Sequence, residues 1–188
     1  MNLLFSKDKD GKDSPPEPMD KLHWEGLMRG QILSAAMDKF SAYILLADQK
    51  AQAMIILNSI LVPVALGWLN DPIFQYGATV AIITAMVSIL SSILCIYPKR
   101  QQGHKPDGTR NLLHFGDIGR MQESDYLITF NPVFNSLDAL TEETVKDLHD
   151  IAQHIIIPKF FWLKLSYGSF FIGNLIAISW TMITVFTA

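Results

Sequence analysis

The sequence predicts an all-α membrane protein with three transmembrane helices and long cytoplasmic helical extensions. Three observations support this class: three long uncharged apolar runs, Lys and Arg confined to two regions, and a near absence of strand-like alternation. Hydrophobic residues make up 49% of the chain and charged residues 18%, below the ~25% typical of soluble proteins. The polar sequence that remains is too short to cover three such runs in water.

The chain before the first apolar run divides into two segments. Residues 1–18 mix charges and contain no apolar core long enough for a secretory signal peptide, so we expect a disordered tail. Residues 19–50 predict one cytoplasmic helix, because apolar residues recur at helical spacing and no proline interrupts them. We expect this helix to continue directly into the first span.

Residues 51–97 predict a transmembrane hairpin. The uncharged run 51–69 would extend about 28 Å as a helix, close to the ~30 Å hydrocarbon thickness of a bilayer. A second uncharged run covers 73–97, and the short connection between the two makes the spans antiparallel. Polar residues inside spans either line a pore or join helices by hydrogen bonds, the commoner case; they are Asn58, Gln75 and Asn174.

Residues 98–164 predict a cytoplasmic loop and helical region. Two prolines, two glycines and four bases within 98–111 indicate a loop. Gly116 and Gly119 then favour short turns or short helices, and residues 131–136 indicate another turn.

A helical pattern resumes at Leu137. Glu142 and Glu143 fall in its early turns, where acids suit the helix dipole. Pro158 should kink this helix or restart it at the membrane surface. The third span is predicted at residues 165–187, the last uncharged run.

The basic residues predict the orientation. All 15 Lys and Arg lie in residues 1–50 or 98–164. The positive-inside rule therefore places both regions in the cytoplasm and the C-terminus on the opposite side.

No catalytic motif is present: the sequence contains no Walker loop, nucleophile elbow or HExxH. We therefore predict no enzyme, no cofactor and no metal site. His149 and His154 are five positions apart, not the three or four that place ligands on one helix face. Cys95, the single cysteine, is expected to be a buried apolar thiol. A net charge of −3 argues against nucleic-acid binding.

The best ligand candidate is the segment 98–120. Its bases could pair with a phosphate, and His114 and Phe115 could stack on a nucleobase. The alternative is the common basic flank of a membrane hairpin. The bases in question are Arg100, Lys105, Arg110 and Arg120.

Asp48 and Lys50 interrupt an apolar stretch, residues 40–69, whose ~45 Å as a helix is too long for one untilted span. A charge at the bilayer centre costs roughly 2.5–3.5 kcal/mol, so we expect both at the cytoplasmic surface, with the span starting at Ala51. Residues 43–47 should then pack against protein.

Two interpretations of this charged pair stay open. In one it is a boundary marker, with Lys50 reaching the headgroups. In the other it is a coupling point, where Asp48 pairs with a base such as Arg100 or Lys164 at the mouth of a neighbouring span.

Three blocks of the chain resemble the transmembrane Pycsar effectors. They are "ADQKAQAMIILNSIL" at 47–61, "NLLHFGDIGRMQESDY" at 111–126 and "DIAQHIIIPKFFWLKLSYGSFFIG" at 150–173. The positions that match the family are Asp48, Lys50, Asn111, Phe115, Gly116, Asp117 and Tyr126. On this resemblance Asn111 and Asp117 join the predicted ligand-binding residues.

The resemblance implies a bacterial antiphage role. A partner pyrimidine cyclase makes cyclic CMP or cyclic UMP after infection, and the effector impairs the inner membrane so that the infected cell stops growing. The implied location is the inner membrane, with a cytoplasmic N-terminus and a periplasmic C-terminus. Because the chain has no strand-rich segment for a β-roll, any nucleotide pocket is expected to consist of helices and loops.

Two further expectations concern assembly. Three spans are too few to enclose a sizeable pore alone, so disruption of the lipid bilayer would need a homo-oligomer. The alternative function is a ligand-independent membrane anchor or scaffold for a cytoplasmic partner.

Overall fold

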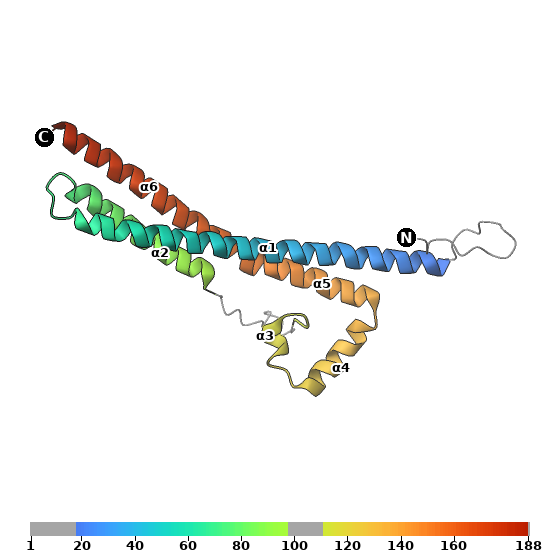
Figure 1. The fold of residues 1–188 in the computed structure, drawn as a ribbon. Helices are drawn as coiled ribbons and strands as arrows, with labels where there is room; N and C mark the ends of the chain where they lie inside the picture. Colours follow the sequence, from blue (N-terminus) through green and yellow to red (C-terminus); the bar gives the residue numbers. More distant parts are fainter. Residues whose placement is uncertain (1–17, 98–110, 188) are drawn as a thin grey trace, which may run out of the picture.

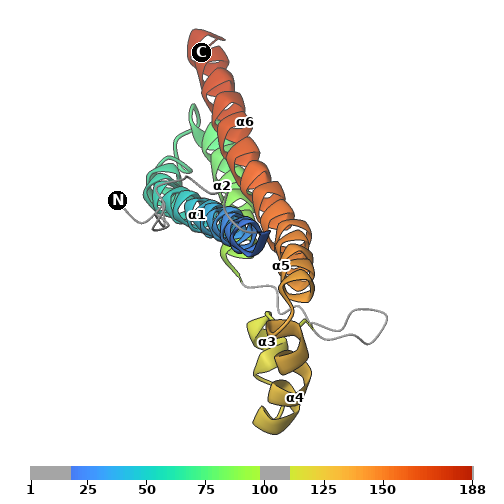
Figure 2. The ribbon, with the colours of Figure 1, turned by 90° about the vertical axis from the view of Figure 1, so that its right-hand side faces the viewer.

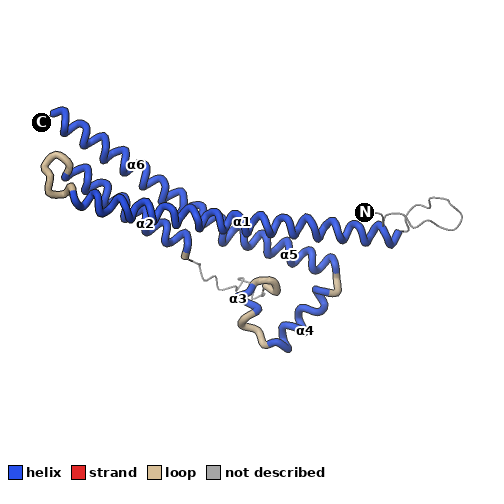
Figure 3. The backbone as a smooth tube through the Cα atoms, in the orientation of Figure 1, coloured by secondary structure: helices blue, strands red, loops and turns tan. Residues whose placement is uncertain are grey.

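The computed structural model describes residues 18–97 and 111–187, and these residues are helical apart from short connections (Figure 1). No strand occurs within these two ranges, which confirms the all-α class (Figure 3). In chain order the elements are α1 Pro18–Gly67, α2 Gln75–Ile96, α3 Phe115–Ile118, α4 Glu123–Phe134, α5 Leu137–Ile151, the π-helical turn η1 Ala152–Ile156, and α6 Ile157–Thr187.

The longest element is α1, a single helix of 50 residues. At ~1.5 Å per residue it extends about 75 Å, more than twice the thickness of a bilayer core. The prediction that the helix of residues 19–50 continues without a break into the apolar run at residue 51 is therefore confirmed. In Figures 1 and 2, α5 and α6 form a second long rod that lies against α1 and then diverges from it toward the C-terminus.

The hairpin connection is longer than the sequence suggested. It covers residues 68–74, because α1 ends at Gly67 and α2 begins only at Gln75. Asp71 organises this turn: its side-chain Oδ1 accepts from the Ile73 N–H at 2.9 Å, and its carbonyl accepts from the Gln75 N–H at 2.9 Å. The first connecting residues complete the end of α1, because the N–H groups of Trp68 and Leu69 bond to the carbonyls of Ala65 and Leu66 at 3.1 Å and 3.3 Å.

The predicted turn at 131–136 is wrong over most of its length. Residues 131–134 belong to α4, with Pro132 inside the helix, and only Asn135 and Ser136 form the connection. Pro132 lies in the last turn of α4, so its missing N–H removes a single intrahelical hydrogen bond. Ser136 then caps α5, because its Oγ accepts from the Ala139 N–H at 3.4 Å.

The regular α-helix is interrupted directly before Pro158, which agrees with the predicted irregularity at this proline. The rod does not continue as a regular α-helix but passes through η1, in which the Ile157 N–H bonds to the carbonyl of Ala152. This wider turn shifts the hydrogen-bond pattern by one residue immediately before Pro158. The proline itself has no backbone N–H and cannot donate a hydrogen bond. The helix beginning at Leu137 is likewise confirmed as α5.

Among residues 18–97 and 111–187, three helices are by length and composition long and apolar enough to cross a membrane, as the sequence predicted. In α2 the outward face carries large apolar side chains, among them Ile83, Met86 and Leu90, each more than half exposed. Its buried face instead consists of small residues: Gly77, Ala78, Ala81, Ala85, Ser88, Ser91, Ser92 and Cys95. Small residues inside and large apolar residues outside are the arrangement typical of helices packed in lipid.

Gly173 allows α6 to approach α2 closely, and we expect Gly173→Ala to destabilise the bundle. A Cβ at this position would overlap the side chain of Thr84, including its Cβ, which cannot swing away. Overpacking of this kind costs about 1–3 kcal/mol. The matched control is Gly168→Ala on the same helix, where a Cβ meets nothing within 4 Å. Thermal unfolding in detergent should separate the two variants; equal midpoints would contradict the close contact.

Candidate functional site

One candidate site lies where α1 meets the start of α6. Lys159 of α6 donates a hydrogen bond from its Nζ to Oδ1 of Asp48 on α1. The two side chains are only 13% and 27% exposed, so water screens this ion pair incompletely. Ala47 and Ala51, fully buried on either side of Asp48, pack with Leu163 and Cys95 beneath the pair.

The partner of Asp48 is a base beside a neighbouring apolar helix, as the coupling interpretation expects, but it is Lys159 rather than Arg100 or Lys164, the two examples named. Lys164 does not pair with it; Lys164 is exposed, because five residues along a helix turn a side chain about 140° away from Lys159. Arg100 lies outside the described residues. Lys50 is exposed beside the pair. The geometry thus matches the ion pair that the coupling interpretation requires, with Lys159 in place of the partners expected.

We expected residues 43–47 to pack against protein, but within a single chain only Ala47 of this stretch is buried. Ala47 is buried, whereas Leu45 is 59% exposed. Tyr43 is 39% exposed; its ring lies 6.5 Å from that of Phe160 between centroids, and Nζ of Lys39 lies over it at 5.8 Å. The reason is that the α5–α6 rod covers one side of α1 and leaves the other side uncovered.

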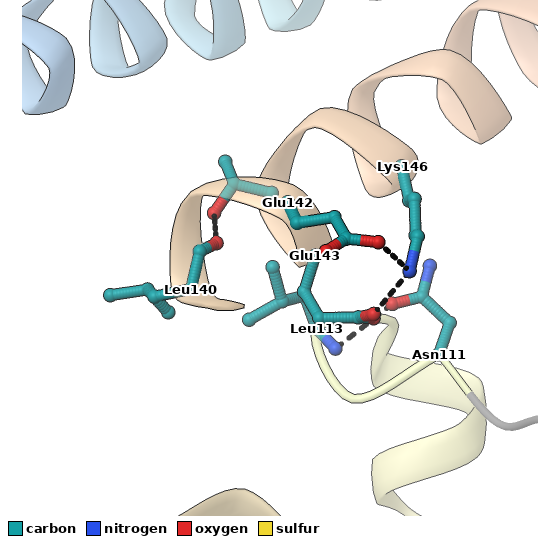
Figure 4. Close-up of polar contacts among 7 residues, drawn as sticks. Asn111, Leu113, Leu140, Glu142, Glu143 and Lys146 are labelled. Carbon is teal, nitrogen blue, oxygen red and sulfur yellow. Dashed lines mark hydrogen bonds and ion pairs between the residues drawn. The ribbon is translucent and has the colours of Figure 1, made fainter. Parts of the chain in front are cut away.

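A second candidate site surrounds Asn111. Its side-chain Nδ2 donates to Oδ1 of Asp147 on α5 at 2.7 Å, and its backbone N–H donates to Oδ2 of Asp117 on α3 at 2.9 Å. Its Oδ1 accepts from the Leu113 N–H at 3.0 Å (Figure 4). Asn111, Asp117 and Asp147 are all at most 6% exposed. One asparagine therefore ties the α3 segment to α5 through two buried carboxylates.

A charged cluster lies next to this network on α5. Lys146 contacts Glu142 at 2.8 Å and Glu143 at 2.9 Å (Figure 4). The hydrogen bond with Glu142 raises the pKa of Lys146 most, and the hydrogen bond with Glu143 raises it further. In turn, the hydrogen bond from Lys146 lowers the pKa of Glu142. Lys146 is therefore held by two carboxylates on its own helix.

The predicted ligand residues differ in whether the structure describes them and in how exposed they are. Arg100, Lys105 and Arg110 lie outside the described residues. Asn111 and Asp117 are joined to each other by their hydrogen bond and are buried, whereas Arg120 is exposed just beyond α3. His114 is half-buried, and Phe115 begins α3. The described candidates thus lie around one short helix, with their acidic and amide groups directed inward and Arg120 at the surface.

Asp147 is the residue that the sequence reasoning missed. It lies on the inward stripe of α5, where Leu140, Thr144, Asp147 and Ile151 follow helical spacing. A carboxylate on such a stripe is the signal that could have identified it, since buried charges are almost always paired. Tyr126, a position that matches the family, also contacts this region, because its hydroxyl donates to the Leu112 carbonyl at 3.4 Å.

Comparison with known proteins gives one match. A family model described as the Pycsar effector protein domain matches residues 32–187, a range that contains both candidate sites and nearly all of the described helices. No curated protein and no solved structure matches the chain.

Proposed function

Because this chain belongs to the Pycsar effector family, we propose that it is an antiphage effector that impairs the inner membrane in response to cyclic CMP or cyclic UMP. The infected cell then stops growing. The observation that carries the proposal is the family match, which extends over all three apolar helices.

The spacing of aromatic and charged residues supports insertion of these helices. At the hairpin end, Trp68 packs on Phe74 at 5.5 Å and Tyr76 on Trp180 at 6.2 Å. Aromatic residues of this kind gather at membrane interfaces. The opposite end of the bundle carries the Asp48–Lys159 pair.

The distance between these two levels fits a bilayer. On α1 the stretch from Asp48 to Gly67, the residue before Trp68, rises about 29 Å, and on α6 the stretch from Lys159 to Trp180 rises about 31 Å. Both match the ~30 Å hydrocarbon core. The charged end is then the cytoplasmic end by the positive-inside rule, which leaves the hairpin tip and the C-terminus in the periplasm.

A continuous mechanical route supports control from the cytoplasm. The α3 segment is held to α5 by Asn111, and α5 continues through η1 to Lys159 and α6. A π-helical turn is a point where a helix can change register, so a shift of α5 reaches the Asp48–Lys159 pair directly. Nucleotide bound near α3 would act through this route, provided that it binds one arrangement better than the other.

Charge decides which part of the site would meet the nucleotide. Asp117 and Asp147 would repel a phosphate, whereas Arg120 at the surface and the bases at Arg100, Lys105 and Arg110 would attract it. The buried network therefore positions the segment, and the arginines and lysines supply the phosphate contacts.

The uncovered face of α1 supports assembly into a homo-oligomer. Trp24, Met28 and Ile32 lie on the part of α1 before the proposed span and are 50%, 54% and 65% exposed. Apolar residues at helical spacing on a long helix pair readily with a second copy. A cytoplasmic partner could cover the same face, which is the basis of the scaffold alternative.

The proposal is tested with energised inside-out vesicles from bacteria that express the chain. We expect cyclic CMP or cyclic UMP to collapse the potential reported by a voltage-sensitive dye, and the linear nucleotides CMP and UMP to leave it unchanged. Inside-out vesicles present the cytoplasmic face, so a response confined to right-side-out vesicles would contradict the topology. No response in either orientation would favour the anchor or scaffold function.

A further inference from the structure

The interface between α2 and α6 is lined by small and hydroxyl-bearing residues along most of its length. Near the hairpin end Gly77 lies against Ala177, where an added Cβ would come within 3.0 Å of the Ala177 carbonyl oxygen. At the other end the Cys95 thiol donates to the Lys159 carbonyl at 3.3 Å. We name this interface the α2–α6 seam.

The middle of the seam holds a chain of hydroxyls. Ser88 and Ser92 of α2 lie 3.0 Å and 2.7 Å from the Oγ of Ser166 on α6. All three serines are fully buried. These groups satisfy one another only while the two helices stay together.

Asn58 of α1 adds an observation that packing does not explain. Its Nδ2 donates to the Met54 carbonyl at 2.7 Å and to the Ser88 Oγ at 2.9 Å. These two bonds fix the amide orientation, because a flipped amide would direct Oδ1 at the Met54 carbonyl oxygen. Asn58 is fully buried, and its Oδ1 accepts no hydrogen bond from any residue that the structure describes. An unpaired acceptor beside a chain of hydroxyls is a position that favours water.

We propose that the α2–α6 seam is the water-filled path that forms when the effector is activated. This inference rests on the proposed function and adds to it which surfaces separate. The physical reason is that the serines and Asn58 cannot be exposed to lipid without losing their hydrogen bonds, whereas water replaces those bonds. Separation of α6 from α2 therefore admits water, while the large side chains on the outer face of α2 stay in lipid.

The π-helical turn and the Asp48–Lys159 pair lie at the cytoplasmic end of this seam. Lys159 contributes both its ammonium group to Asp48 and its carbonyl to Cys95, so it contacts α1 and α2 together. A register shift at η1 moves this residue first. The seam would accordingly open from its cytoplasmic end.

Cysteine accessibility tests the inference. Ser88→Cys, Ser92→Cys and Ser166→Cys are made singly in a Cys95→Ser background and reconstituted into vesicles of phosphatidylethanolamine and phosphatidylglycerol. The control is Leu90→Cys, which lies at the same depth on the lipid-facing side of α2 and is 59% exposed. The probe is a charged methanethiosulfonate that reacts with thiolates in water.

With cyclic CMP or cyclic UMP we expect the seam cysteines to react at least about tenfold faster than without nucleotide, because only a hydrated thiol ionises readily. Leu90→Cys should stay unreactive in both states. Vesicles that depolarise while the seam cysteines stay unreactive would overturn the seam and leave the proposed function intact. Equal reaction at Leu90→Cys and at the seam would also overturn it, since the whole bundle would then be wet.

A disulfide between the two helices makes the test independent of the nucleotide. Ser88→Cys combined with Ser166→Cys places two thiols at a position where the native oxygens are 3.0 Å apart. We expect cells in which the protein is disulfide-linked, as a non-reducing gel shows, to escape the growth arrest caused by overexpression, and a reductant to restore the arrest. Arrest that persists while the protein stays disulfide-linked would refute the seam.

Discussion

Asp48→Asn is expected to make membrane depolarisation independent of nucleotide while the protein still inserts. The change leaves the ammonium group of Lys159, only 13% exposed, without its carboxylate. For a partly buried pair we expect a loss of about 1.5 kcal/mol from the resting arrangement, which raises the active fraction roughly tenfold. Depolarisation in the dye assay should then begin without cyclic nucleotide.

The controls for this prediction use the neighbouring charges. Lys50→Gln removes an exposed charge two positions away and should leave the nucleotide response unchanged. Lys159→Gln should reproduce the effect of Asp48→Asn, and the exchange Asp48→Lys with Lys159→Asp should restore nucleotide dependence. If Asp48→Asn responds like the unaltered chain, the pair is a boundary marker and the coupling proposal is wrong.

Asn111→Leu is expected to release the α3–α4 segment from α5 without disturbing the membrane bundle. Leucine cannot donate to Asp147, so that carboxylate stays buried without the side-chain hydrogen bond that now satisfies it. We expect a local cost of about 3 kcal/mol, which corresponds to roughly hundredfold faster hydrogen exchange in α3 and α4. Exchange in α2 and α6 should stay unchanged.

A graded series separates charge from hydrogen bonding in this network. Asp147→Asn keeps an oxygen that can accept from Asn111 and should have an intermediate effect. Asn135→Ala replaces an exposed asparagine at the end of α4 and should have no effect. Unchanged exchange in Asn111→Leu would show that the network does not hold the segment. Faster hydrogen exchange in α2 and α6 as well would show that the Asn111 network stabilises more than the α3–α4 segment.

The identity of the elements followed from local patterns. Uncharged runs predicted the helices that are long and apolar enough to cross a membrane, and Pro158 predicted an irregularity where η1 lies. The prediction failed at residues 131–136, because proline and asparagine signal a turn only when nothing else holds the helix, and α4 continues through Pro132. Within α4, Tyr126, Phe130 and Phe134 form a stack of rings along one face.

The candidate sites were predictable only in part. Asp48, Asn111 and Asp117 were identified because their types and positions match the family. Their partners, Lys159 and Asp147, were not, because each lies far away in sequence and on another helix. A carboxylate signals that a partner exists but carries no information about which distant base or amide meets it.

By itself, the sequence determined the all-helical class, the three membrane-length helices and the family, because hydropathy, helical periodicity and the motif blocks are local properties of a chain. Only the tertiary structure decided that Asp48 meets Lys159, that Asn111 joins Asp117 to Asp147, and that Ser88, Ser92 and Ser166 form one buried chain. These contacts depend on the rotation and depth at which long helices pack. Small changes in either would bring different residues together, so spacing along each helix cannot specify them.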